Sequence, residues 1–149
     1  GSKVFGDQER MNALTKAIGD IAAEMKSIID EWRETCTTEA IAILEAVNLI
    51  EAGYSKWCDA TWLVAAEDDV ALPRLMERNG FSEEEAKQRL ASQRNWKDRA
   101  PASDLIFHNN SATANFTSNI DEKISETGEL LKANCLPVSR WFAWHDQQQ

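Results

Sequence analysis

The sequence predicts a helix-rich α/β fold in which a parallel sheet is flanked by helices, giving three layers. Three short apolar runs carry this prediction, at residues 40–46, 61–66 and 105–107. The first run consists of small and β-branched residues and is broken only by Glu45, which is the pattern of a strand buried on both faces. Residues between and around the runs have helical spacing, and strands that alternate with helices form parallel sheets.

The length and charge of the chain narrow the class of protein. With 149 residues it can form one domain with a sizeable core, since a domain of this size buries roughly 70% of its unfolded surface. We therefore expect a single domain over residues 1–149. The formal charge of −9 argues against a nucleic-acid partner, because phosphate backbones bind basic surfaces.

Neither the cysteines nor the apolar runs indicate a metal centre or a membrane protein. Cys36, Cys58 and Cys135 are widely spaced, and neither His108 nor His145 stands at ligand spacing from them. We therefore expect no metal site and a reducing compartment. The first residues do not resemble a signal peptide, and no apolar run approaches the length of a membrane span. We expect a cytoplasmic protein that binds no membrane.

The first predicted element is a long helix capped by Asp7. Its apolar residues alternate in steps of three and four and form one stripe: Met11, Leu14, Ile18, Ile21, Met25, Ile28 and Trp32. This stripe is typical of a helix that packs on a sheet, although a coiled-coil seam has the same spacing. Gly19 and Asp20 weaken the middle of the helix, because glycine there costs about 1 kcal/mol relative to alanine.

A helix with two arginines follows the strand at residues 61–66. Arg74 and Arg78 share one face, because residues four apart are neighbours on a helix. Gly80 predicts the end of the helix, since glycine takes the left-handed conformation found there. Glu67, Asp68 and Asp69 suit the opening of this helix, because the helix dipole favours acids there, whereas Pro73 fits a first turn and would start the helix near residue 72.

A second helix is predicted directly after the first. Ser82 and Glu85 have the spacing of a capping box, which opens a helix by satisfying its first backbone amides. This helix carries Arg89 and, one turn later, Gln93. After the strand at residues 105–107, Asn109 stands at a strand's carboxyl end, where open α/β sheets bind ligands.

The rest of the chain is predicted to cover the sheet. Residues 95–103 are polar and contain a proline, which suits a mobile connection over a site. Residues 117–133 have the spacing of a covering helix. Trp141, Phe142 and Trp144 crowd the tail and either pack back on the domain or meet a partner, and we favour packing back.

Two strings in this region resemble a known family. They are R-L-M-E-R-N-G-F-S-E-E-E-A-K-Q-R-L-A-S-Q at residues 74–93 and S-D-L-I-F-H-N-N at residues 103–110. In order and spacing they are similar to the C-terminal half of bacterial dephospho-CoA kinase. The similarity extends to E-A-V-N-L-I-E-A-G at residues 45–53 and, more weakly, to V-F-G-D at residues 4–7.

The resemblance implies a P-loop kinase that transfers the γ-phosphoryl of ATP, with Mg²⁺, to the ribose 3′-hydroxyl of dephospho-CoA in coenzyme A biosynthesis. The phosphate-binding sequence G-x-x-x-x-G-K-S/T does not occur in the 149 residues. We therefore expect a kinase-like portion that lacks the N-terminal P-loop strand and is inactive alone. ATP and Mg²⁺ would bind if a complementary N-terminal segment were supplied.

The resemblance also assigns roles to single residues. Arg74 and Arg78 match lid arginines that close over the ATP phosphates, in a lid of about residues 68–100, and are the candidate catalytic residues. Arg89 and Asn109 match nucleotide-binding positions. Glu45 is a candidate substrate-binding carboxylate, or else a member of a structural ion pair. By chemistry alone, the arginines would be a solvated helix face that pairs with neighbouring acids.

Three hypotheses follow for the whole chain. It is part of a dephospho-CoA kinase, or a non-catalytic binding or scaffold protein with the same fold, or a rearranged chain in which the long helix serves assembly. In the resembling fold the P-loop strand lies between the strands matching residues 40–46 and 61–66. This gap would leave backbone groups unpaired, so the two strands close up directly, another segment adds a strand, or two copies associate through the long helix. We favour the homo-oligomer.

Overall fold

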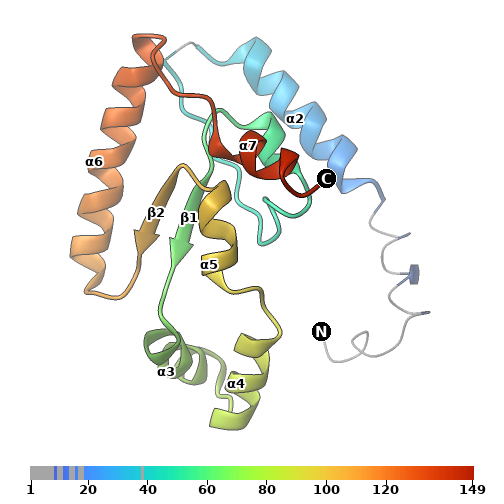
Figure 1. The fold of residues 1–149 in the computed structure, drawn as a ribbon, viewed down its shortest axis with the longest axis vertical. Coiled ribbons are helices and arrows are strands. Elements are labelled where there is room, and N and C mark those ends of the chain that lie inside the picture. Colours follow the sequence, from blue (N-terminus) through green and yellow to red (C-terminus); the bar gives the residue numbers. More distant parts are fainter. Residues whose placement is uncertain (1–8, 10–11, 14–15, 17–18, 38) are drawn as a thin grey trace. The chain divides into compact units, whose positions relative to one another are not determined.

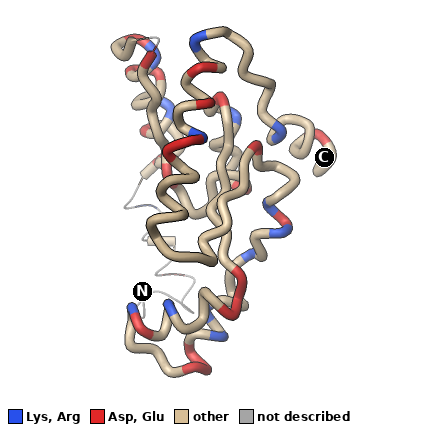
Figure 2. Tube along the Cα trace, turned by 90° about the vertical axis from the view of Figure 1, so that its left-hand side faces the viewer, with Lys and Arg blue, Asp and Glu red and all other residues tan. Residues whose placement is uncertain are grey.

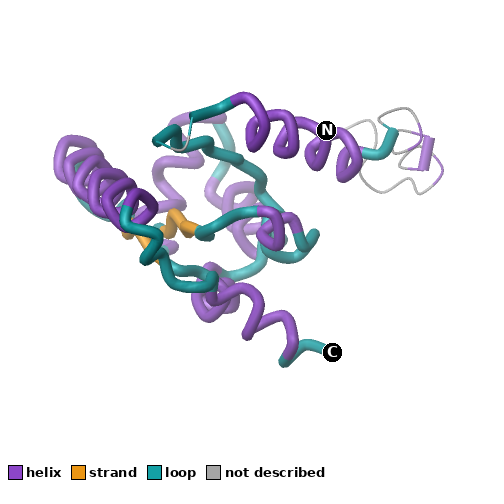
Figure 3. Tube along the Cα trace, turned by 90° about the horizontal axis from the view of Figure 1, so that it is seen from above, coloured by secondary structure: helices purple, strands orange, loops and turns teal. Residues whose placement is uncertain are grey.

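The computed structural model describes residues 9, 12, 13, 16, 19–37 and 39–149 (Figure 1). They divide into two compact units, residues 1–42 and residues 43–149. Most of the trace is helical and the strands are short (Figure 3). A helix-rich α/β fold is therefore confirmed, whereas the single domain over residues 1–149 stays a prediction.

The first unit contains helix α2, Ile21–Thr35. Gly19 has a φ of 80°, and Asp20 caps α2 by accepting a hydrogen bond from the amide of Ala23 at 3.0 Å. The prediction of one uninterrupted helix was therefore wrong at this point, because a left-handed glycine and a new cap start a separate helix. The predicted stripe continues along α2, but its earlier members, Met11, Leu14 and Ile18, lie outside the described residues, as does the cap Asp7.

The second unit contains a parallel pair of strands, β1 (Trp62–Ala65) and β2 (Leu105–His108). Trp62 is paired with Leu105 and Ala65 with His108, and both predicted strands are confirmed. A hydrogen bond of 2.7 Å from the amide of Asn109 to the carbonyl of Ala65 continues the pairing beyond the strands.

The third predicted strand is absent, because residues 39–46 form no strand in the structure. A strand needs a neighbour for its backbone groups, and in the described part of the chain the sheet consists of β1 and β2. Ile43 is accordingly 72% exposed and Val47 76% exposed. Residues 40–46 have the composition of a strand, but the described elements provide no neighbouring strand with which they could pair.

Helices α3 (Asp68–Asn79) and α4 (Glu83–Ala91) form a hairpin after β1. Gly80 ends α3 with a φ of 67°, and Ser82 opens α4 through a complete capping box, both as predicted. Of the two predicted starts, the acidic one is confirmed and the one near residue 72 was wrong, since α3 begins at Asp68 and holds Pro73 inside. The acidic first turn suits the helix dipole, and the amide of Glu67 donates to Asn110 Oδ1 at 3.0 Å, which supports the earlier start.

Short helices occupy the predicted polar connection. Asn95 caps α5 (Trp96–Arg99), which runs into the 3₁₀ turn η2 (Ala100–Ala102) before β2. Another 3₁₀ turn, η1 (Tyr54–Trp57), precedes β1. The covering helix α6 extends over Thr113–Lys132, four residues earlier at its start than predicted, and α7 covers Arg140–Asp146.

The tail packs back on its own unit through Trp141. This residue is 3% exposed and joins Ile50 and Ala102 in the core, with Trp144 packed against them. The indole Nε1 of Trp141 donates a hydrogen bond of 3.2 Å to the carbonyl of Ile50. Packing of the aromatic tail on the domain is confirmed for these two tryptophans, whereas Phe142 is 41% exposed.

Asp104 connects the start of both strands to this tail. Its Oδ2 accepts hydrogen bonds from the amide of Thr61 at 2.6 Å and the hydroxyl of Ser139 at 2.7 Å. Its Oδ1 accepts one from the amide of Arg140 at 2.7 Å. Both carboxylate oxygens are therefore used, and the Asp104 side chain fixes the beginning of α7 beside the beginning of β1.

We expect Asp104→Asn to lower the free energy of unfolding by about 1–3 kcal/mol, because one carboxylate oxygen becomes an amide that cannot accept, which leaves a donor without a partner. Urea unfolding measures this change. Asp121→Asn is the matched control, since Asp121 is exposed on α6. Equal losses in the two variants would show that the Asp104 contacts do not stabilise the fold.

Candidate functional site

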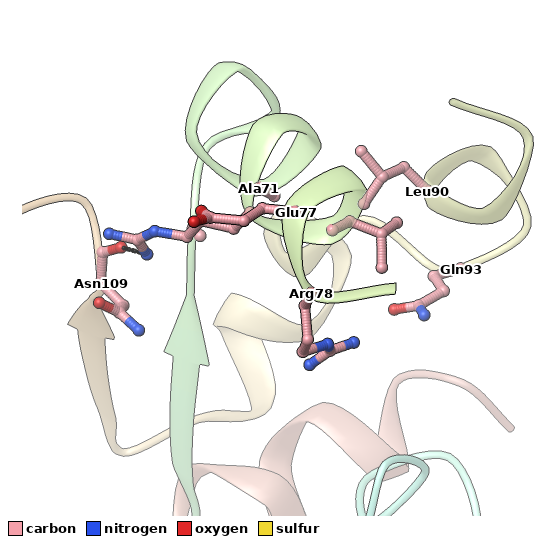
Figure 4. Close-up of a pocket in the computed structure, with 9 residues that line it drawn as sticks. Ala71, Glu77, Arg78, Leu90, Gln93 and Asn109 are labelled. Carbon is pink, nitrogen blue, oxygen red and sulfur yellow. Dashed lines mark hydrogen bonds between the residues drawn. The ribbon is translucent and has the colours of Figure 1, made fainter. Parts of the chain in front are cut away.

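A pocket lies at the carboxyl end of the two strands, beside the α3–α4 hairpin (Figure 4). It is open to solvent and has a volume of about 560 Å³. Its lining combines small apolar residues with charged and amide side chains: Ala66, Ala71, Arg74, Leu75, Glu77, Arg78, Leu90, Gln93 and Asn109. This is the edge at which parallel α/β sheets bind ligands.

The α3 helix supplies the cations of the pocket. Arg74 and Arg78 are one turn apart, and both line the pocket, as their spacing predicts. The Arg74 guanidinium donates from Nη1 to the carbonyl of Asn109 at 2.6 Å and from Nη2 to the carbonyl of Ser111 at 3.5 Å. The Arg78 Nε donates to Asn79 Oδ1 at 2.9 Å.

Neither of these arginines forms an ion pair with a described carboxylate. Glu83 is paired with Lys87 at 2.6 Å, and Glu85 accepts from Ser82 within the capping box. In Figure 2 the hairpin at the bottom of the view carries both acidic and basic residues. Glu83 and Glu85 are therefore engaged elsewhere, whereas Glu77 lines the pocket beside the two arginines without forming an ion pair with either of them.

The structure brings three of the five predicted site residues together and leaves two apart. Arg74, Arg78 and Asn109 share the pocket, and Figure 4 shows Asn109 at the end of β2. Arg89 is not among the lining residues, and its guanidinium lies 4.5 Å from the centre of the Phe81 ring. Glu45 is exposed in the segment at residues 39–46, which forms no strand, and it does not line the pocket either.

Sequence reasoning missed the contribution of Gln93, Glu77 and Leu90 to the pocket. Gln93 was placed one turn after Arg89 without a role, but it lies beyond the end of α4 and lines the pocket with Leu90 (Figure 4). The repeated four-residue spacing along α3 and α4 was the available signal. It identifies a shared face, and the way in which the hairpin folds decides which face meets the pocket.

Two glutamates in the first turn of α4 have lowered pKa values. Hydrogen bonds from the Ser82 amide and hydroxyl lower the pKa of Glu85 from its usual value. The hydrogen bond and charge of Lys87 lower the pKa of Glu83. Within the described part of the chain, no three His, Cys, Asp or Glu side chains gather to hold a metal ion, and no helix is long and apolar enough to cross a membrane.

Comparisons with known proteins identify the class to which this fold and site belong. A family model described as dephospho-CoA kinase matches residues 1–115. The chain belongs to the dephospho-CoA kinase family. The predicted resemblance is therefore confirmed, and α7 lies beyond the matched residues.

Curated relatives support the same assignment. The chain is 42% identical over 108 residues to dephospho-CoA kinase of Streptococcus agalactiae, covering 72% of this chain and 54% of the relative. It is 33% identical over 110 residues to that of Geobacillus kaustophilus, covering 74% and 54%. For Streptococcus mutans the identity is 39% over 87 residues, covering 58% and 44%. The chain thus spans about half the length of the curated relatives that it matches.

The capping box predicts a pH dependence of α4. The folded pKa of Glu85 is lowered below 4.5, so its stabilising contribution is present above that value and is lost as the pH falls through the lowered pKa. We expect Ser82→Ala to raise the Glu85 midpoint toward 4.5, because the hydroxyl donor is gone. A carboxyl NMR titration measures both midpoints, and an unchanged value in the variant would contradict the role of the hydroxyl.

Proposed function

We propose that this chain supplies the lid and nucleotide-binding part of a dephospho-CoA kinase, which transfers the γ-phosphoryl of ATP to the ribose 3′-hydroxyl of dephospho-CoA in coenzyme A biosynthesis. One observation carries the proposal. Two guanidinium groups without a described carboxylate partner line a pocket at the carboxyl end of parallel strands. The family membership agrees with this reading of the pocket.

The cations suit the chemistry of phosphoryl transfer. The reaction needs little covalent help from the protein, but it needs cations near the oxygens on which charge changes. Guanidinium groups meet phosphate oxygens with a planar set of donors, so Arg74 and Arg78 are the proposed catalytic residues. The apolar part of the pocket, including Leu75 and Leu90, would accept a less polar part of the nucleotide.

The other predicted residues have less direct support. Asn109 lines the same pocket and is proposed to approach the nucleotide base. Arg89 is proposed to act from the lid of about residues 68–100 after leaving Phe81, against which it lies in this structure. Glu45 is proposed to bind the substrate if residues 40–46 are drawn into the sheet, because that would bring it to a strand's carboxyl end.

The complete fold is proposed to have three layers, a parallel sheet with helices on both faces. A P-loop strand would lie in this sheet between residues 40–46 and β1. Val64 in β1 is 58% exposed and Ile43 is 72% exposed, so both segments carry uncovered apolar residues with strand preference. The P-loop sequence is not found in this chain, and the described residues gather no set of metal ligands. In this proposal ATP and Mg²⁺ are held jointly with a P-loop segment.

A scaffold role with self-association is the second proposal. Ile21 and Ile28 belong to the predicted apolar stripe and are 47% and 44% exposed on α2. A helix that exposes part of its apolar face can bind a second copy. The homo-oligomer stays a prediction, and light scattering of the purified chain measures it. Cytoplasmic location is likewise a prediction.

We expect the chain of 149 residues to phosphorylate no dephospho-CoA on its own. Without a P-loop, the backbone cradle that positions the phosphates and stabilises their charge is missing. A coupled assay with Mg²⁺ and ATP should give the rate of the blank. Turnover above the blank would show that these residues contain all the catalytic groups.

With a P-loop segment supplied, we expect Arg78→Ala to lower turnover by about 10²-fold or more, because a cation that stabilises the transition state is lost. The unfolding midpoint should change little, since Arg78 is exposed and bonded only to its neighbour Asn79 among the described residues. Arg140→Ala is a control, since Arg140 does not line the pocket. Equal turnover of Arg78→Ala and the unchanged chain would show that Arg78 is a solvated surface residue without a role in catalysis.

A further inference from the structure

The α3–α4 hairpin is joined to the sheet by few contacts. Its two helices pack chiefly against each other, and the hairpin extends from the carboxyl end of β1 (Figure 1). An element with few packing contacts to its surroundings opens more easily than the core. Specific polar contacts therefore have a large share in fixing its position relative to the strands.

Those polar contacts converge on three consecutive residues after β2. The carbonyls of Asn109 and Ser111 accept from Arg74, and the side chain of Asn110 accepts from the amide of Glu67. Of these three contacts, the two made by Arg74 come from within α3, and they place a charged donor on backbone acceptors. Hydrogen bonds with one charged partner are about twice as strong as neutral ones.

Arg78 differs from Arg74 in this respect. Its hydrogen bond is with Asn79, the next residue in the same helix, at 2.9 Å. That contact holds α3 to nothing outside itself, and it uses Nε alone among the three guanidinium nitrogens. Figure 4 shows Arg78 among the residues that line the pocket.

We infer that the two arginines have different roles: Arg78 keeps the catalytic role proposed above, whereas Arg74 is a positioning residue in place of the catalytic role proposed for it there. The Arg74 guanidinium latches the hairpin to residues 109–111, and this latch keeps Arg78, Gln93 and Asn109 around one pocket. Arg78 is the cation that meets the anion. The latch follows from the contacts of Arg74 alone, whereas the role of Arg78 rests on the proposed function.

The latch requires an arginine at position 74, and a positive charge alone is not sufficient. A guanidinium reaches two carbonyls at once because its donors are fixed in a planar fork, and a lysine ammonium carries its donors on a single atom. Arginine and lysine have similar helix propensities, so Arg74→Lys leaves α3 itself intact. The charge is kept and only the two-point contact is lost.

Hydrogen exchange of the ligand-free chain tests the latch directly. We expect amides of α4 and the following turn to exchange about tenfold faster in Arg74→Lys, the factor that corresponds to loss of a charged hydrogen bond. Arg78→Lys should exchange like the unchanged chain. Ser111→Ala is a further control, because it keeps the backbone carbonyl that accepts from Arg74. Unchanged exchange in Arg74→Lys would overturn the latch.

Binding of tripolyphosphate and ATP to the chain with a P-loop segment supplied, followed by calorimetry, tests the division of roles. At position 78 charge is what matters, so Arg78→Gln should weaken binding about tenfold and Arg78→Lys should restore most of it. At position 74 geometry matters, so Arg74→Lys should bind as weakly as Arg74→Gln. Rescue by lysine at both positions would overturn the inference. If the unchanged chain binds neither ligand even with the P-loop segment supplied, the proposed function fails, and the exchange experiment still decides the latch.

Discussion

The carboxylate of Asp104 is the contact on which the second unit most depends. It accepts from the backbone before β1 and from the first residues of α7, so two segments 78 residues apart, from Thr61 to Ser139, meet on one side chain. Once α7 is held there, Trp141 reaches the core and bonds to Ile50. A tail beyond the family match is thereby made part of the domain.

The Asp104 contacts hold the amino ends of β1 and β2, whereas the pocket lies at the carboxyl ends of the same strands. The amino ends of β1 and β2 are tied to buried groups, and the ion pair of Arg99 with Glu51, at 2.6 Å, adds a further tie on that side. The carboxyl ends carry an open pocket and a hairpin that packs mainly on itself. A rigid base with a more weakly attached lid suits a site that must close over a ligand.

Features with local causes could be predicted from the sequence, and those that depend on distant partners could not. The capping box of Ser82 and the left-handed Gly80 act within a few residues, and both are found as predicted. Asp104 was given no role, because nothing near it in the sequence reveals three donors that come from residues 61, 139 and 140. Likewise, spacing placed Arg74 and Arg78 on one face but could not distinguish a residue that binds backbone carbonyls from one that faces solvent.

The segment at residues 40–46 shows why a correct pattern can give a wrong element. Its apolar and β-branched residues favour a strand, yet a strand is stable only when neighbours satisfy its backbone and cover its side chains. In this structure Ile43 and Val64 are both exposed. In the proposed kinase, a P-loop strand would provide the backbone partner that residues 40–46 lack, and the same strand would carry the phosphate cradle. The failed strand and the incomplete site therefore have a single physical cause in that proposal: the sheet and the phosphate site would be completed by the same segment.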